Sequence, residues 1–328
     1  MCSLVDSITI YFPEETLDNK KLSNLFNVDD KKILKATGIK NRYISSKEET
    51  ASDMAYQVVE KFFNRYSINR AIIDCLIFCS ECYDYIAPTS SCILQDRLKL
   101  NNNTACLDLP YGCSGYIYGL AMAKSFVNTG IAKNILFVTA DTSTKTISPS
   151  DLELRSIFSD AASVTLINQE NYKTIGEFIF GTDGAGWNSI YIDRSGFRNP
   201  TDRSFLESGG LANGKMVMNG LDIFNFGLRV VPQLVSDTLE KNKLKFEDID
   251  LFIFHQPSLF LLKTLRKKLN IPENKFFVNI EAHGNTVSTS IPLALKEARE
   301  QGKLNTGMTI LLVGFGIGFS WAGSIIKT

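Results

Sequence analysis

The sequence predicts an α/β fold built from two pseudo-duplicated halves. Strand-like and helix-like segments alternate along the 328 residues, as they do in sheets covered by helices. Residues 73–80 resemble residues 249–256, and residues 111–114 resemble residues 283–286. The two segments of each pair are separated by about half the chain. The order of predicted strand, turn and helix repeats together with the residue types. Chance similarity among apolar strands is the alternative to duplication.

The predicted elements follow one another without a linker rich in Pro, Ser or Gly. Apolar runs predict strands at residues 72–78, 104–109, 135–139, 163–167, 251–254, 276–280 and 309–313. Helix-like segments lie at residues 50–63, 115–127, 222–240, 258–268 and 292–300. Small residues in the second of these helices allow close packing against its neighbours. We expect an N-terminal half at residues 1–170 and a C-terminal half at residues 171–328.

The composition is that of an ordinary globular protein, with 44% apolar and 21% charged residues. Lys+Arg and Asp+Glu both number 35, so no global field favours nucleic acid or a membrane surface. No apolar stretch is long enough for a membrane span, and the N-terminus lacks the pattern of a secretory leader. Seven cysteines, all in the first third, make a poor disulfide framework. We therefore expect a cytoplasmic protein.

Three residues in polar breaks are candidates for chemistry. Cys113 lies where an extended segment meets a helix start, and the positive end of the helix dipole is expected to lower its pKa. His255 ends an apolar strand, and histidine is the side chain that most often transfers protons near neutral pH. Asn285 follows Gly284 in a turn. Taken singly, each also fits a structural role: a buried thiol, a satisfied polar group and a turn residue.

Motifs around these residues occur in a fixed order along the chain. They are Asp108, Cys113 and Gly115 in Asp-x4-Cys-x-Gly; His255-Gln256; His-Gly-Asn-Thr at 283–286, leading into 291–295; the glycine-rich 314–321; and Thr-Gly-Ile-x-x-Arg at 37–42. With these motifs the whole chain resembles the β-ketoacyl-acyl-carrier-protein synthase III family. The resemblance implies a thiolase-like fold, with two halves in a layered αβαβα arrangement, and a homodimer. It also implies an acyltransferase that condenses acyl groups in fatty-acid or specialised lipid synthesis.

The resemblance assigns roles to the candidate residues. Cys113 would carry the acyl group as a thioester, and His255 and Asn285 would hold the malonyl thioester carbonyl during decarboxylation. The backbone N–H groups of Cys113 and Gly318 would form the oxyanion hole. His283 would support the Asn285 loop. No cofactor and no metal are implied.

Asn285 bears on the reaction type. An amide donates a hydrogen bond to an enolate without repelling it, whereas relatives that acylate oxygen or nitrogen carry a carboxylate there. Acyl transfer to an amine or alcohol, and a subunit of a hetero-oligomeric ketosynthase, remain alternatives. A third alternative is a radical iron–sulfur site, from the C-x3-C-x2-C spacing of Cys75, Cys79 and Cys82.

The chain departs from the family where relatives grip coenzyme A. Lys32 stands where a Trp is expected, and Ala36, Leu152 and Phe260 stand where Arg is expected. Without an aromatic face and guanidinium groups we expect the primer to arrive on an acyl carrier protein, with weak binding of coenzyme A as the alternative. A basic cluster on the helix after His255 is the predicted docking site, with a solvated helix face as the alternative; it comprises Lys263, Arg266, Lys267 and Lys268.

The acyl pocket is the second departure. Short-chain relatives often set a bulky Phe in the segment after the first repeated strand. Ala87 aligns with that position, and a slip of one residue would place Ile86 there. The smaller side chain predicts room for a longer or branched acyl group.

Overall fold

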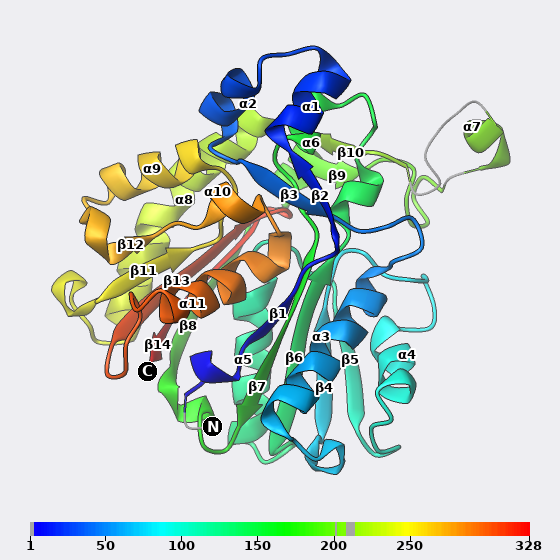
Figure 1. The fold of residues 1–328 in the computed structure, drawn as a ribbon. Helices are drawn as coiled ribbons and strands as arrows, with labels where there is room; N and C mark the ends of the chain where they lie inside the picture. The colour runs from blue at the N-terminus through cyan, green and yellow to red at the C-terminus, as the bar shows by residue number, and fades with distance from the viewer. Residues whose placement is uncertain (1–2, 201, 208–213) are drawn as a thin grey trace.

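The computed structural model describes residues 3–200, 202–207 and 214–328, and it confirms the α/β class (Figure 1). Two five-stranded sheets have the same order. The first runs β1 (Thr9–Tyr11), β7 (Ala161–Asn168), β6 (Asn134–Asp141), β4 (Cys75–Cys79), β5 (Ala105–Leu109). The second runs β8 (Ile175–Thr182), β14 (Ser320–Lys327), β13 (Thr309–Gly316), β11 (Leu251–Phe254), β12 (Phe276–Phe277).

The strand directions match as well as the order. In each sheet the first two pairings are antiparallel and the last two are parallel. The strands predicted as repeats, β4 and β11, therefore occupy equivalent positions. We keep the division at residue 170 as a proposal; it falls between β7 and β8.

Helices form the remaining layers of the αβαβα arrangement (Figure 1). The central helices α5 (Gly115–Asn128) and α11 (Ser290–Glu300) lie between the two sheets. Helices α3 (Ala51–Tyr66) and α4 (Ser90–Arg97) cover the outer face of the first sheet. Helices α8 (Gly220–Lys241) and α9 (Leu259–Lys268) cover that of the second.

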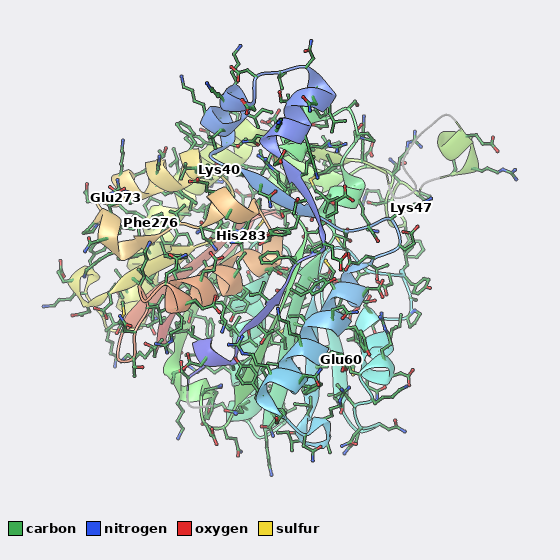
Figure 2. All side chains as sticks on the ribbon, viewed as in Figure 1. Lys40, Lys47, Glu60, Glu273, Phe276 and His283 are labelled. Carbon is green, nitrogen blue, oxygen red and sulfur yellow. The ribbon has the colours of Figure 1, made fainter. Side chains whose placement is uncertain are left out.

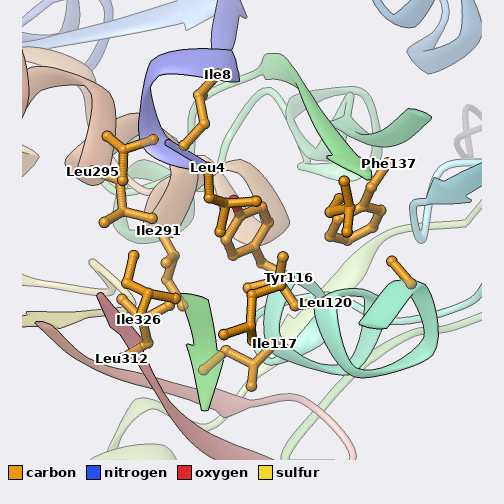
Figure 3. Close-up of a cluster of buried hydrophobic side chains, with 14 of the residues drawn as sticks. Leu4, Ile8, Tyr116, Ile117, Leu120, Phe137, Ile291, Leu295, Leu312 and Ile326 are labelled. Atoms are coloured by element: carbon orange, nitrogen blue, oxygen red, sulfur yellow. The ribbon is translucent and has the colours of Figure 1, made fainter. Parts of the chain in front are cut away.

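The shared core fixes one sheet against the other (Figure 3). Ile117 and Leu120 of α5 pack in the same cluster as Leu312 of β13, and all three side chains are inaccessible to solvent. A Cβ on Gly119 would lie 2.1 Å from Cζ of Phe137, so only glycine allows α5 to approach β6 this closely. Because α5 follows Cys113 directly, this packing also fixes the candidate nucleophile.

The remaining elements are smaller. They are β2 (Glu15–Asp18) paired with β3 (Asn41–Ile44), β9 (Ile190–Ile192) paired with β10 (Met216–Met218), α1 (Asn19–Phe26), α2 (Asp30–Thr37), α6 (Leu152–Arg155), α7 (Arg203–Glu207) and α10 (Ile280–His283). The 3₁₀ turns are Val5–Ser7, Arg70–Ile72, Ser143–Thr146, Tyr172–Thr174, Gly184–Ser189, Phe246–Asp248, Glu273–Lys275 and Val287–Thr289. In the described ranges, no helix has the length and apolar character to cross a membrane.

One predicted strand is shorter than expected. Residues 276–280 were expected to be extended, but only Phe276 and Phe277 pair with β11. The N–H of Asn279 donates instead to Oε1 of Gln256 at 3.2 Å, and the chain turns into α10. A side chain from the loop that follows β11 thus ends the ladder.

Arg42 ties β3 to the segment before β7. It has no exposed surface; its Nε donates to the Ser156 carbonyl at 2.9 Å and its Nη2 to that of Ile39 at 3.2 Å. Burial lowers the pKa of Arg42 to about 10, so the side chain stays cationic at neutral pH. A Cβ on Gly284 would lie 3.3 Å from Cγ of Arg42, so the Arg42 side chain packs closely against this glycine.

We expect Arg42→Ala to lower the free energy of unfolding by about 3 kcal/mol, because buried carbonyls lose a charged donor. Urea denaturation would measure the change. Lys40→Ala is the matched control two residues away: Lys40 pairs with Glu281 on the surface, both more than half exposed (Figure 2), and its loss should cost less than about 1 kcal/mol. Equal losses in the two variants would contradict this expectation.

Candidate active site

Cys113 lies in the short loop between β5 and α5, and its surroundings are closed by the end of β13. A Cβ on Gly316 would lie 2.6 Å from Cβ and 2.7 Å from Sγ of Cys113. The next residue, Ser114, is tied to the start of β14 by a 2.7 Å hydrogen bond between its hydroxyl and that of Ser320. The loop of one half therefore contacts the glycine-rich strand of the other, and glycine at 316 leaves room for the sulfur.

The Cys113 thiol is 8% exposed, and burial raises its pKa to about 12. The nearby Glu81 carboxyl raises this pKa further, while the N–H groups of Ile317 and of Cys113 itself oppose the shift by facing the sulfur. The expectation that the helix dipole lowers the pKa was wrong in direction, because desolvation outweighs it. At neutral pH Cys113 is a thiol, and its attack needs a proton acceptor.

On the β13 side, the N–H of Ile317 faces the Cys113 sulfur. The role of Gly318 as an oxyanion donor stays a prediction. Gly318 has φ +134° in the turn between β13 and β14, and a Cβ there would lie 2.9 Å from the N of Ser320. Sequence reasoning favoured glycine, but a backbone donor needs no particular side chain. Ile317 is therefore the candidate second donor that the pattern missed.

His255 follows β11 and is 1% exposed. Its N–H donates to the Val313 carbonyl at 2.8 Å, and its Nδ1 lies 2.7 Å from the Ser290 hydroxyl. Burial lowers the pKa of His255 to about 3, so the imidazole is neutral at neutral pH. Nε2 donates to a substrate only in the tautomer in which the Ser290 hydroxyl donates to Nδ1. The other acceptor within reach of this hydroxyl is the Val287 carbonyl at 2.9 Å, so the direction of the single Ser290 hydrogen selects the tautomer.

Asn285 is held by the segment before β7. Its N–H donates to the Ile157 carbonyl at 2.9 Å, and its own carbonyl accepts from the Ser159 N–H at 3.0 Å. The side-chain Oδ1 accepts from the Val287 N–H at 2.9 Å. This bond orients the amide, so that Nδ2 is left as the donor for a ligand.

Val287 connects the three candidate residues. Its N–H binds Asn285, its carbonyl lies 2.9 Å from the Ser290 hydroxyl that contacts His255, and its side chain packs in one cluster with Cys113. Its φ of +50° is unusual for a β-branched residue. Such conformations persist only where the surroundings enforce them. The structure thus brings the residues predicted at 113, 255 and 285 around a single strained turn.

A narrow cavity of about 30 Å³ opens beside Cys113. Apolar side chains form most of its lining, with several polar groups among them; they are Glu81, Cys82, Ser143, Thr146, Phe158, Ile190, Tyr191, Ile192, Met216, Val287 and Ile317. Most lining residues come from the short strands β9 and β10 and from turns. No sequence motif predicted that these segments would line the cavity.

The residues predicted for the acyl pocket lie elsewhere in the single chain. Ile86 is 73% exposed, Ala87 is also exposed, and the described lining of the Cys113 cavity includes neither. Their role in the pocket stays a prediction.

The predicted docking cluster divides into two pairs. Arg266 donates to the Ile271 carbonyl at 3.1 Å, and Lys268 donates to that of Leu228 at 2.9 Å. Lys263 and Lys267 are exposed on α9, and their ammonium groups make no hydrogen bond to any residue in the described ranges. They are the members able to meet a partner, and docking stays a prediction.

Three of the positions that depart from the coenzyme A pattern lie in one groove. Lys32, Ala36 and Leu152 line a groove of about 640 Å³ with Val28, Ile33 and Glu153, among others. The described lining contains no arginine and no aromatic ring. Phe260 lies on α9, where its ring stacks on Phe224 at 5.3 Å.

The remaining sequence candidates have structural surroundings. Cys75 and Cys79 lie in β4 with no exposed surface, and Cys79 donates to the Tyr111 carbonyl at 3.2 Å. No cluster of metal-ligating side chains occurs in the described part of the chain. His283 contacts Glu297 through Nε2 at 2.5 Å and stacks on Phe12 at 5.0 Å (Figure 2).

Comparison with known proteins agrees with this geometry. Residues 107–184 match the family model of 3-oxoacyl-[acyl-carrier-protein (ACP)] synthase III, and residues 239–328 match that of its C-terminal part. The β-ketoacyl-[acyl-carrier-protein] synthase III of Caldanaerobacter subterraneus subsp. tengcongensis is 33% identical over 319 residues, 97% of this chain and 95% of that protein.

Solved structures give the same result. A 3-oxoacyl-(acyl-carrier-protein) synthase III with 39% identity covers 99% of both chains with a TM-score of 0.94. The synthase III from Thermus thermophilus has 31% identity, covers 98% of both chains and has a TM-score of 0.87. The chain therefore belongs to the 3-oxoacyl-acyl-carrier-protein synthase III family, and is an acyl-transferring condensing enzyme with the thiolase fold.

Proposed function

We propose that this enzyme transfers an acyl primer to Cys113 and condenses it with a malonyl thioester in which His255 and Asn285 stabilise the developing enolate. The observation that carries the proposal is the Val287 turn. Its N–H donates to Asn285, its carbonyl contacts the Ser290 hydroxyl that lies against His255, and its side chain packs in one cluster with Cys113.

The reaction proceeds in three steps. The Cys113 sulfur attacks the primer thioester, and the donor leaves as a thiol that takes up the proton from Cys113. The malonyl carboxylate then leaves as carbon dioxide, and its electron pair forms an enolate whose oxygen accepts from Nε2 of His255 and Nδ2 of Asn285. The enolate carbon attacks the Cys113 thioester, the C–S bond breaks, and the 3-oxoacyl thioester departs while the Cys113 thiolate regains a proton.

The N–H groups of Cys113 and Ile317 are proposed to stabilise the tetrahedral oxyanions of the first and last steps, since both already face the sulfur. The predicted Gly318 would then act by turning the chain. Neutral His255 suits the middle step, because a neutral imidazole holds the enolate without consuming a proton.

An acyl carrier protein is the proposed primer donor and the proposed carrier of the malonyl group. The groove lined by Lys32, Ala36 and Leu152 has no guanidinium or aromatic side chain for an adenine nucleotide. Lys263 and Lys267 project from α9 and would meet an acidic carrier.

We further propose a homodimer and a cytoplasmic location. Tyr85 and Ile86 are 62% and 73% exposed. A second copy of the chain would cover this apolar surface, and the loop with Ala87 would then approach the Cys113 cavity of that copy. The six cysteines in the described ranges are free thiols, which fits a reducing compartment.

The test uses intact-mass analysis of the whole protein with a panel of matched acyl-carrier and acyl-coenzyme A thioesters, followed by malonyl-carrier protein. We expect one acyl group per chain, faster from the carrier, and then release of carbon dioxide and a 3-oxoacyl product. Acylation without carbon dioxide, with transfer to an added amine or alcohol, would favour the alternative acyltransferase. Equal rates from coenzyme A would overturn the donor assignment.

A further inference from the structure

Glu81 brings a carboxyl group into the Cys113 cavity, where no sequence motif predicted one. It lies two residues after β4 and lines the cavity together with Cys113. Its carboxylate accepts the N–H of Gly112, the residue immediately before the nucleophile. A Cβ on Gly112 would lie 2.8 Å from Oε2 of Glu81, so glycine at 112 lets the carboxyl group approach.

A second buried carboxyl group stands behind Glu81. The Glu81 N–H donates to Oδ1 of Asp141 at 3.0 Å, at the end of β6. Oδ2 of Asp141 accepts from the Ser288 N–H at 3.2 Å and from the Ser288 hydroxyl. Ser288 follows Val287, so this pair of carboxyl groups connects the sulfur with the turn that holds His255 and Asn285.

The cavity makes ionisation of these groups costly. Burial first, and then the charge of Asp141, raise the pKa of Glu81 to about 8, and burial raises that of Asp141 to about 7. The other titratable groups facing the pair are thiols, a phenol and a carboxyl: Cys79, Cys82, Tyr83, Cys113 and, behind Asp141, Asp160. The described lining of the cavity holds no lysine, arginine or histidine. Glu81 therefore exchanges its proton near neutral pH.

We propose that Glu81 is the catalytic acid–base of Cys113, taking the thiol proton when the sulfur attacks the primer and supplying protons to the thiolates that leave. This rests on the proposed function. In acylation the S–H bond of Cys113 breaks as the S–C bond forms, and the proton goes to the Glu81 carboxylate. The carboxylic acid then protonates the departing donor thiolate, which restores the carboxylate.

The same residue completes the condensation. Before the condensation the Glu81 carboxylate takes up a proton from solvent. When the C–S bond to Cys113 breaks, the Cys113 thiolate takes this proton, and the Glu81 carboxylate is ready for the next acylation. This is the proton that the overall reaction consumes as the malonyl carboxylate becomes carbon dioxide. The transfer is favourable, because the Cys113 thiol has a pKa of about 12 and Glu81 one of about 8.

The test is single-turnover acylation of the full chain by an acyl-carrier thioester between pH 6 and 10 (roughly the range in which Glu81 titrates), followed by intact mass. In the wild-type protein the rate should rise with pH and level off near pH 8, where Glu81 becomes the carboxylate. Glu81→Gln should lower the rate about 10²–10⁴-fold and remove the levelling, because only thiolate formed by hydroxide then reacts. Asp141→Asn should shift the levelling to lower pH, because the charge that raises the pKa of Glu81 is gone.

Controls separate this inference from the proposed function. Glu49→Gln, an acid bonded to Tyr11 outside the cavity, should keep the wild-type profile. If the wild-type chain takes no acyl group at Cys113, the proposed function fails. If it does, and Glu81→Gln keeps the wild-type rate and levelling, Glu81 is not the acid–base.

Glu81→Asp covers the case in which the Gln variant does not fold. It keeps a carboxyl group but withdraws it by one methylene, and it should slow acylation by about tenfold while retaining a levelling. A wild-type rate in Glu81→Asp would overturn the assignment.

Discussion

Replacing Cys113 with alanine is expected to lower 3-oxoacyl product formation by at least about 10⁴-fold and to abolish the covalent acyl-enzyme. The physical reason is that the sulfur faces two backbone N–H groups and the acid Glu81, and no water can replace that arrangement. Alanine keeps the Cβ that packs against Gly316, so the loop should retain its place. Product formation and intact mass measure the two effects.

Cys82→Ala is the matched control, because Cys82 lines the same cavity and is also a free thiol. It should retain stoichiometric acylation and most of the turnover. An acyl label that persists in Cys113→Ala but disappears in Cys82→Ala would show that Cys82, and not Cys113, is the nucleophile.

Replacing His255 with alanine is expected to lower condensation about 10²–10³-fold while acylation of Cys113 proceeds near its wild-type rate. The imidazole is neutral and buried, with Nδ1 on Ser290, so its remaining nitrogen is suited to donate to an enolate oxygen. Carbon dioxide release from a malonyl thioester reports that step, and mass analysis reports acylation. Equal loss of both activities would mean that His255, rather than Glu81, deprotonates Cys113.

Ser290→Ala tests how the His255 tautomer is set. Without the hydroxyl, Nδ1 loses its partner at 2.7 Å and the ring is free to carry its proton on either nitrogen. Carbon dioxide release should fall by less than in His255→Ala, by about tenfold, with acylation unchanged. Conversely, a Ser290→Ala variant as impaired as His255→Ala would mean that the hydroxyl itself contacts the substrate.

The sequence alone predicted the central strands of both sheets and five of the longer helices, but not strands β1, β8 and β14. The repeat of apolar strands at 73–80 and 249–256 predicted β4 and β11, which hold equivalent places in the two sheets. The ordered motifs around Cys113, His255 and Asn285 identified the family, and the alternation of elements predicted the class. These features are local: periodicity and short motifs depend on neighbouring residues, so a single chain displays them directly.

Only the tertiary structure decided the environment of the candidate residues. Burial, not the helix end, dominates the pKa of Cys113; the N–H of Ile317 faces the sulfur; and Glu81 enters the cavity from the turn after β4. Half of the basic cluster bonds to nearby carbonyls. Desolvation and contact depend on what distant segments place around a group, which no local pattern encodes. For this reason the sequence predicted Cys113 as the nucleophile, whereas only the tertiary structure indicated Glu81 as the group that accepts its proton.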